Sequence, residues 1–236
     1  LLTTSEYGIA QTYLSWVSIL TLIVGLSLGN SIRTAYVDFH DDIEGYMSSI
    51  FGLSLLSFLV SSALIIAGMF IFGNIDIILV ICCLIQSYFQ FVATAMTTKY
   101  MMKVDYIRKT LLLALPNLTI QVIAIFTIMN MHGDKKYFGY IIPYAAVYMV
   151  VGIYFVISSF IRGKKPLNKL YWKYALTYSL PLIFHGLSLV LLSSSDRIMI
   201  TNLYNSSEAG VYSLIYNLSM VAMAVTASLE AVWVPW

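Results

Sequence analysis

Seven long apolar stretches, each close to the length needed to cross a bilayer, determine what this chain can fold into. The hydrocarbon core of a membrane is ~30 Å thick, and an α-helix needs about 20 residues to cross it. The stretches lack the alternation of polar and apolar residues that a membrane β-strand requires. We therefore predict an all-α, polytopic transmembrane helical bundle. The predicted spans are residues 7–29, 49–72, 76–97, 110–130, 139–161, 174–203 and 209–235.

The composition excludes most other classes of protein. The 236 residues are 60% hydrophobic and only 10% charged, whereas a soluble domain has about 25% charged residues. A water-soluble enzyme, a nucleic-acid-binding domain and a disordered chain are therefore ruled out. Cys82 and Cys83 are adjacent within an apolar run, where we expect packing residues with no redox or metal role. We expect no cofactor, no metal site and no nucleic-acid partner.

Basic residues predict the orientation of the spans. Ten of the 13 Lys and Arg residues lie in connections 30–48, 98–109 and 162–173, and two, Lys135 and Lys136, lie on the other side. The positive-inside rule places the first group in the cytoplasm. The residues before the first span then lie outside, so a protein that begins in the cytoplasm needs an odd number of spans upstream. Because the chain starts at Leu1 and stops at Trp236 within an apolar stretch, we expect a fragment of a longer protein.

Polar residues inside the spans mark faces that point to protein or to water, since a polar group facing lipid is costly. In four spans these residues form stripes on one helical face. The stripes are Gln86, Gln90, Thr94 and Thr97; Asn117 and Gln121; Thr177, Pro181, His185 and Ser188; and Tyr212, Tyr216, Ser219, Thr226 and Glu230. Each stripe alone is explained by interhelical hydrogen bonds, worth about 0.6 kcal/mol each. Together they favour a shared polar cavity, although a tightly packed bundle stays open as an alternative.

Proline and glycine inside the spans suggest local features of the helices. Pro116, Pro143, Pro181 and Pro235 remove helical hydrogen bonds and are either hinges or static kinks. Gly25 and Gly29 form a small-residue motif at the end of the first span, where we expect close helix packing.

A few charges lie within spans or at their ends, where an ionisable residue is a functional candidate. Asp196 and Arg197 interrupt an apolar run, and adjacent helical residues point ~100° apart, so they do not simply neutralise each other. For Arg197 two interpretations stay open: an interhelical salt bridge, or an anion-binding residue whose guanidinium suits phosphate. Arg33 is either an interfacial residue or a substrate ligand. Glu230 is either a hydrogen-bonded residue or a site of cation coupling.

An acidic cluster in connection 30–48 raises the possibility of catalysis. Asp38, Asp41 and Asp42 could hold Mg²⁺ and a diphosphate, as in membrane prenyltransferases, because hard cations prefer several carboxylate oxygens. Such a site needs a second cluster, which the sequence lacks, so we favour a solvated loop and keep a prenyltransferase as a remote alternative. His40, His132 and His185 are scattered and do not form a zinc site.

Three short motifs resemble a known family. They are Leu180–Ser188 (LPLIFHGLS), Ser195–Ile200 (SDRIMI) and Ala209–Ser213 (AGVYS). This pattern resembles the middle of bacterial polysaccharide flippases of the O-antigen and capsule type, within the multidrug/oligosaccharidyl-lipid/polysaccharide exporter superfamily. Residues 2–8 and 231–236 are also similar to segments of that family.

The resemblance implies two helical lobes around a central cavity and alternating access between its two openings. Residues 1–173 would form the N-lobe without its first helix, and residues 174–236 the first two helices of the C-lobe. The implied function is not enzymatic: it is the flipping of an undecaprenyl-diphosphate-linked oligosaccharide to the external leaflet of the bacterial cytoplasmic (inner) membrane. The implied partners are this lipid-linked oligosaccharide, membrane lipids, a polysaccharide polymerase and glycosyltransferases.

Within this family, Asp196 and Arg197 match the motif, and other cavity residues are our own inference. The full set of substrate-binding candidates is Arg197, Asp196, His185, Arg33, Gln86, Gln90, Asn117 and Gln121, with Glu230 as the candidate for ion coupling. A multidrug or cation antiporter of the same superfamily is the alternative. It would need an acidic residue deep in an N-lobe helix, and only Asp76, at the end of a span, comes near this. The transported sugar and the coupling ion stay open.

Overall fold

Helices make up almost the whole structure. The computed structural model describes the backbone of residues 2–72, 76–131 and 135–233, and the side chains of 2–69, 76–131 and 135–221. These residues contain no β-strand. Two short 3₁₀ turns, Leu28–Asn30 and His40–Asp42, flank a short helix near the N-terminus. The helices are α1 (Thr4–Gly25), α2 (Ser31–Asp38), α3 (Ile43–Phe72), α4 (Ile77–Met102), α5 (Tyr106–Asn130), α6 (Phe138–Gly163), α7 (Lys169–Leu203) and α8 (Ser206–Trp233).

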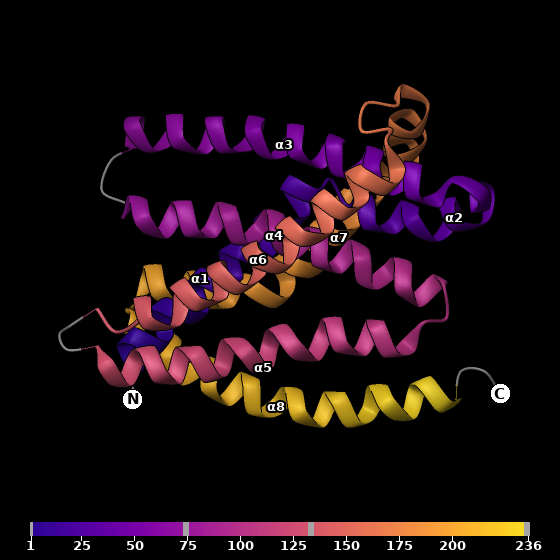
Figure 1. Cartoon of the computed structure of the whole chain (residues 1–236). Helices are drawn as coiled ribbons and strands as arrows, with labels where there is room; N and C mark the ends of the chain where they lie inside the picture. Colours follow the sequence, from indigo (N-terminus) through magenta and orange to yellow (C-terminus); the bar gives the residue numbers. More distant parts are fainter. Residues whose placement is uncertain (1, 73–75, 132–134, 234–236) are drawn as a thin grey trace.

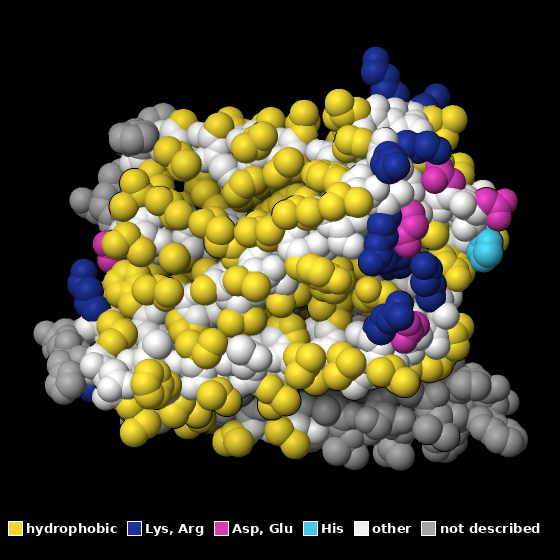
Figure 2. All heavy atoms as spheres, viewed as in Figure 1, with side chains coloured by type: hydrophobic (Ala, Val, Ile, Leu, Met, Phe, Trp, Pro, Cys, Tyr) yellow, Lys and Arg dark blue, Asp and Glu magenta, His cyan; other side chains and the backbone are white. Residues whose placement is uncertain are grey.

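The predicted all-α, polytopic bundle is confirmed. Within the described residues, six helices are long and apolar enough to cross a membrane, namely α1, α3, α4, α5, α6 and α7. Helix α8 follows α7 and corresponds to the seventh predicted span. The long helices run back and forth, so that the connections α1–α3, α4–α5 and α6–α7 gather at one end of the bundle (Figure 1). We call this the basic end, because most visible Lys and Arg side chains lie there while apolar side chains cover the middle (Figure 2).

Several helices extend further than hydropathy alone predicts. Helix α3 begins at Ile43 rather than at residue 49, and α7 begins at Lys169 rather than at residue 174. Asn168 caps α7, because its side chain accepts a hydrogen bond from the Leu170 backbone N–H at 3.0 Å. Connection 30–48 contains helix α2. Polar residues at the ends of these helices lower the mean hydropathy of that part of the sequence. They do not end the helix, so the observed helix begins earlier than hydropathy predicts.

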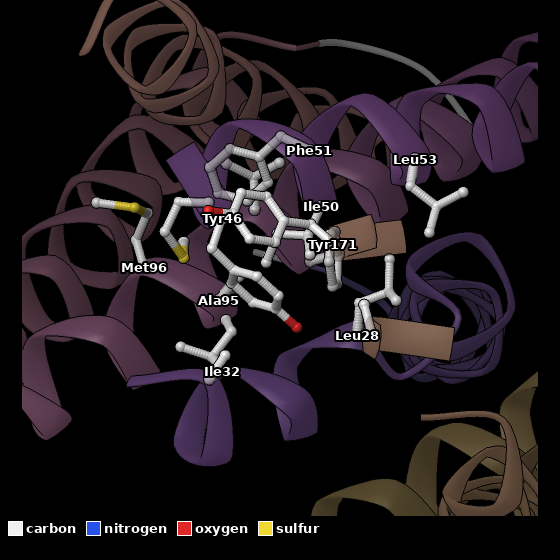
Figure 3. Packing of buried hydrophobic residues seen from close by; sticks show 14 of the residues in the cluster. Leu28, Ile32, Tyr46, Ile50, Phe51, Leu53, Ala95, Met96 and Tyr171 are labelled. Atoms are coloured by element: carbon white, nitrogen blue, oxygen red, sulfur yellow. The ribbon is translucent and has the colours of Figure 1, made fainter. Parts of the chain in front are cut away.

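A packed core lies toward the basic end, between α2, α3, α4 and the start of α7. Tyr46, Ile50 and Phe51 of α3 are fully buried there, and Tyr171 of α7 packs against them (Figure 3). The Tyr46 hydroxyl donates to the Ser31 hydroxyl at 2.6 Å, which joins α3 to α2. The core therefore fixes the first turns of α7 against the helices that precede it in the chain.

Pro116, Pro143 and Pro181 lie inside helices that continue through them, so whether each is a hinge or a static kink stays a prediction; Pro235 lies outside the described residues. The predicted close packing of the small-residue motif holds at Gly25 and not at Gly29. A side chain at Gly25 would clash with the Phe91 ring of α4, with Cβ 2.3 Å from Cδ2, whereas Gly29 has nothing within 4 Å. The helix ends between the two glycines, since Leu26 and Ser27 have left-handed φ values of 47° and 51°.

Candidate functional site

Arg197 and Asp196 both point to α8 and not to each other. The Arg197 guanidinium lies over the Tyr216 ring, with Cζ 4.6 Å from the centroid. The Tyr212 hydroxyl donates to Asp196 at 2.8 Å, and Tyr212 and Tyr216 stack one helical turn apart. Within the described residues, Arg197 forms no ion pair, and its Nε is buried without a hydrogen-bond partner. Among the side chains that the structure describes, no carboxylate therefore neutralises this positive charge inside a membrane span.

A separate chain of polar side chains begins at Asn217 of α8 and crosses three further helices, with Tyr7 interacting electrostatically with Tyr140. Asn217, next to Tyr216, donates to the Tyr7 hydroxyl of α1 at 2.9 Å. On α6, the Tyr140 hydroxyl donates to the Tyr144 hydroxyl at 3.3 Å, and the Gln121 amide of α5 reaches Tyr144 at 3.4 Å. Sequence reasoning singled out Gln121 but missed the tyrosines of α6, whose spacing of four residues was a usable signal.

At the end opposite the basic end, α1 is held tightly against α7 and α8. A Cβ on Gly8 would lie 1.8 Å from the Ser206 carbonyl oxygen, and one on Gly210 would lie 2.0 Å from that of Thr4. Hydroxyl pairs flank this contact: Thr4 with Ser207 at 2.8 Å and Thr12 with Thr201 at 2.7 Å. We call these contacts the α1–α8 junction. Because α7 and α8 belong to the predicted C-lobe, this junction lies between the two predicted lobes.

The stripe on α4 does not face one common space. Gln86 is fully buried, and its Oε1 accepts a hydrogen bond from Tyr13 of α1 at 2.8 Å. Gln90 is half-buried, while Thr94 is exposed and donates to the Gln90 carbonyl of its own helix. Gln86 thus serves helix packing, because a buried amide in a membrane protein is stabilised by an interhelical partner.

The remaining candidates are spread over the molecule. His185 is exposed in the middle of α7, and Arg33 is exposed on α2 at the basic end. Asn117 is exposed, and its amide donates to the Leu113 carbonyl of its own helix at 2.7 Å. The side chains of Glu230 and Thr226 lie outside the described residues. The structure therefore brings Asp196, Arg197, Tyr212 and Tyr216 together. Gln121 belongs to the separate polar chain that begins at Asn217, and His185 and Arg33 lie apart.

Two residues of the acidic cluster in connection 30–48 form hydrogen bonds with α7 and with the connection between α6 and α7. This corrects the expectation of a solvated loop. Asp42 accepts hydrogen bonds from Lys165, at 2.5 Å, and from Tyr171. Asp38 accepts one from Tyr174 at 2.5 Å. Across the described residues, no group of three His, Cys, Asp or Glu side chains could hold a metal ion. The observed role of Asp38 and Asp42 is to hold the start of α7.

Sequence reasoning also missed Glu6, a buried carboxylate at the start of α1. It accepts hydrogen bonds from the Thr3 backbone at 2.9 Å and from the Lys136 backbone at 3.0 Å. The Thr3–Glu6 capping box, visible in the sequence as Thr-x-x-Glu, was the signal for it. The carboxylate oxygens of Glu6 therefore cap α1 and hold the α5–α6 connection in place. Asp76, the acid nearest to the one that the antiporter alternative requires, is exposed at the N-terminus of α4.

A scan against protein families matches residues 1–236 to the family described as "Polysaccharide biosynthesis protein". The chain belongs to this family. As a member of this family whose described residues include six helices able to cross a membrane, it is a multi-pass membrane protein. Searches of the curated proteins and of the solved structures give no match. The division into lobes at residue 173 and the roles of the individual candidate residues stay predictions.

Proposed function

We propose that this protein flips an undecaprenyl-diphosphate-linked oligosaccharide from the cytoplasmic to the external leaflet by alternating access. Its family supports a role in polysaccharide biosynthesis, and its helices support a location in the membrane. In this proposal the substrate's diphosphate binds at Arg197, and the cavity lies between the lobes that meet at the α1–α8 junction.

The observation that carries the proposal is the state of Arg197. A cation inside a membrane is costly unless it is paired or faces water, yet within the described residues this guanidinium has only the Tyr216 face as a partner. Arg offers a planar fork of donors that matches the oxygens of a phosphate. Its buried, unpartnered Nε is a donor that an anionic ligand could satisfy.

The nearby tyrosines and amides suit the rest of such a substrate. Gln121 and Asn217 offer hydrogen-bonding groups, and the half-buried rings of Tyr140 and Tyr144 form a tilted pair with centroids 4.9 Å apart. Sugars present many hydroxyl groups, which amides and tyrosine hydroxyls can bind. Polar groups on helices near a phosphate-binding cation are therefore consistent with a headgroup that carries both phosphate and sugar.

The test is to replace Arg197 by Ala and by Lys in the protein and to measure complementation of a flippase-null strain. We expect R197A to abolish complementation while membrane insertion is retained, and R197K to restore part of it, since Lys keeps the charge but loses the fork. The matched control is R108A, which removes an exposed Arg paired only with Asp105 three residues away. Full complementation by R197A would overturn the role of Arg197.

A further inference from the structure

We propose that a groove along α6 near the basic end binds one anionic phospholipid of the bilayer, with its phosphate at Arg162. The groove has a volume of about 350 Å³ and is lined by Tyr154, Ile157, Ser158, Ile161 and Arg162. This site is independent of the proposed flippase function, because none of its residues belongs to the cluster around Arg197 or to the polar chain that begins at Asn217.

The shape of the groove suits an acyl chain. Its lining residues are spaced by three, four, seven and eight positions, so they share one face of α6. Tyr154, Ile157 and Ile161 expose 62%, 53% and 64% of their surface. At 1.5 Å per residue, the groove extends about 12 Å along the helix from Tyr154 to Arg162. From Tyr154 toward Arg162, apolar lining residues are followed by a cation. A lipid has the same order, with an apolar acyl chain followed by a polar headgroup.

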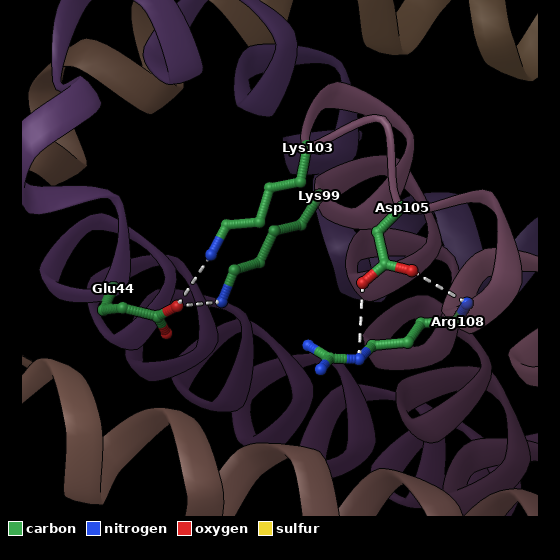
Figure 4. Close-up of polar contacts among 5 residues, drawn as sticks. All are labelled: Glu44, Lys99, Lys103, Asp105 and Arg108. Carbon is green, nitrogen blue, oxygen red and sulfur yellow. Dashed lines mark hydrogen bonds and ion pairs between the residues drawn. The ribbon is translucent and has the colours of Figure 1, made fainter.

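The charges around the groove favour an anion. Arg162 forms no ion pair or hydrogen bond within the described residues, and it interacts electrostatically with Lys99 and Tyr100 of α4. The nearest carboxylates already have partners. Glu44 contacts Lys99 at 2.6 Å and Lys103 at 3.4 Å, and Asp105 contacts Arg108 at 3.3 Å (Figure 4). Three cations therefore share these two carboxylates, and Arg162, like several lysines at this end, has no ion pair within the described residues.

The position of the groove favours a lipid over a soluble anion. Apolar side chains cover the side of the molecule on which α6 lies, and Lys and Arg side chains form a band at its basic end (Figure 2). Basic sites between transmembrane helices on the cytoplasmic side bind anionic lipid headgroups, and each basic residue strengthens such binding. The groove thus joins an apolar surface that faces the bilayer to a cation at the predicted level of the headgroups.

The experiment measures phosphatidylglycerol bound to the purified protein in mixed phosphatidylglycerol and phosphatidylcholine nanodiscs, by native mass spectrometry after release. We expect R162A to lower the apparent affinity for phosphatidylglycerol about fivefold, the effect of one basic residue near a membrane surface. The matched control K173A removes an exposed cation of α7 at the same end and should leave binding unchanged. A second variant, S158W, fills the groove while keeping Arg162, and should also reduce binding.

Three outcomes would overturn the proposal. One is retention of phosphatidylglycerol by both R162A and S158W at the wild-type level. Another is an equal loss in R162A and K173A, which would indicate general attraction to the basic end rather than a site. The third is that inorganic phosphate alone raises the thermal stability of the wild-type protein as much as phosphatidylglycerol does, since the ligand would then be a free anion. If R162A fails to fold, S158W decides the question.

Discussion

At the scale of single residues, Gln86 and Arg197 show how differently two polar side chains can be used inside a membrane. Gln86 is fully buried and bonded to Tyr13 on another helix. Arg197 has an aromatic face as its partner and a donor that is not used. Both residues have a buried nitrogen without a hydrogen-bond partner, Nε2 of Gln86 and Nε of Arg197. The difference is that Gln86 is fully enclosed and bonded to another helix, whereas Arg197 carries a charge and is only half-buried, so a polar group in a span is stabilised by protein in the first case and is open to a ligand in the second.

The packing role of Gln86 can be tested with a double-mutant cycle of Y13F and Q86L. We expect each single change to lower the free energy of unfolding by about 1 kcal/mol, because each leaves a buried polar group unpaired or removes the bond. The loss of unfolding free energy in the double mutant should be smaller, by about 0.6 kcal/mol, than the sum of the losses in the two single mutants. The measurement is unfolding of the purified protein in detergent, with S61A as a control, since Ser61 bonds only to its own helix. Strict additivity would contradict the interaction.

At the scale of the helices, α7 is held by hydrogen bonds near its two ends, and its middle exposes one apolar face while Gly186 on another face lies close to Leu22 of α1. Near its start, Trp172 donates to the Ser49 carbonyl at 2.9 Å and Tyr174 to Asp38. Near its end, Thr201 pairs with Thr12 of α1. Between these points, Leu182, Leu189 and other apolar side chains are exposed within the described structure. The start and the end of α7 are therefore fixed by polar contacts, whereas its middle packs on α1 along one face and exposes apolar side chains along another.

The α1–α8 junction depends on glycine, which leads to a prediction for G8A. An added methyl group at residue 8 would clash with backbone of α8, so we expect α8 to be displaced and stability to fall by about 1–3 kcal/mol, as for other overpacked sites. The matched control is G68A on α3, where nothing lies within 4 Å and the higher helix propensity of Ala should be neutral or stabilising. Thermal unfolding in detergent distinguishes the two variants. Equal midpoints would show that α8 does not pack on α1 as described.

At the scale of the whole molecule, the sequence predicted the bundle well and the site only in part. Hydropathy and the placement of Lys and Arg are one-dimensional properties, so the six spans found within the described residues and the connections between them could be read directly, while the seventh span stays a prediction. Which polar residues meet depends on helix rotation and on helix pairing across long sequence separations. The contact of Tyr7 with Asn217 joins helices at opposite ends of the chain, and no local pattern indicates it. Glu6 was missed because it lies in the first turn, where hydropathy is low.

The predicted orientation in the membrane can be checked with single cysteines at Lys135 and Lys164, in a protein lacking Cys82 and Cys83. The positive-inside rule places residue 135 outside and residue 164 in the cytoplasm. We therefore expect a membrane-impermeant maleimide to label K135C in intact cells and to label K164C only after the cells are permeabilised. Labelling is read out by mass shift on a gel. The reverse pattern would invert the orientation and, with it, the direction of the proposed transport.

Alternating access itself can be tested at the junction between the predicted lobes. The Oγ1 atoms of Thr12 and Thr201 lie 2.7 Å apart, so T12C/T201C should form a disulfide between α1 and α7. If the lobes must separate here to release substrate to the external leaflet, oxidation should abolish complementation in a protein lacking Cys82 and Cys83. A reducing agent should then restore it, and the single variants T12C and T201C should be insensitive to oxidant. Transport that continues in the fully oxidised double variant would show that this junction does not open, and the exit path would then have to lie elsewhere.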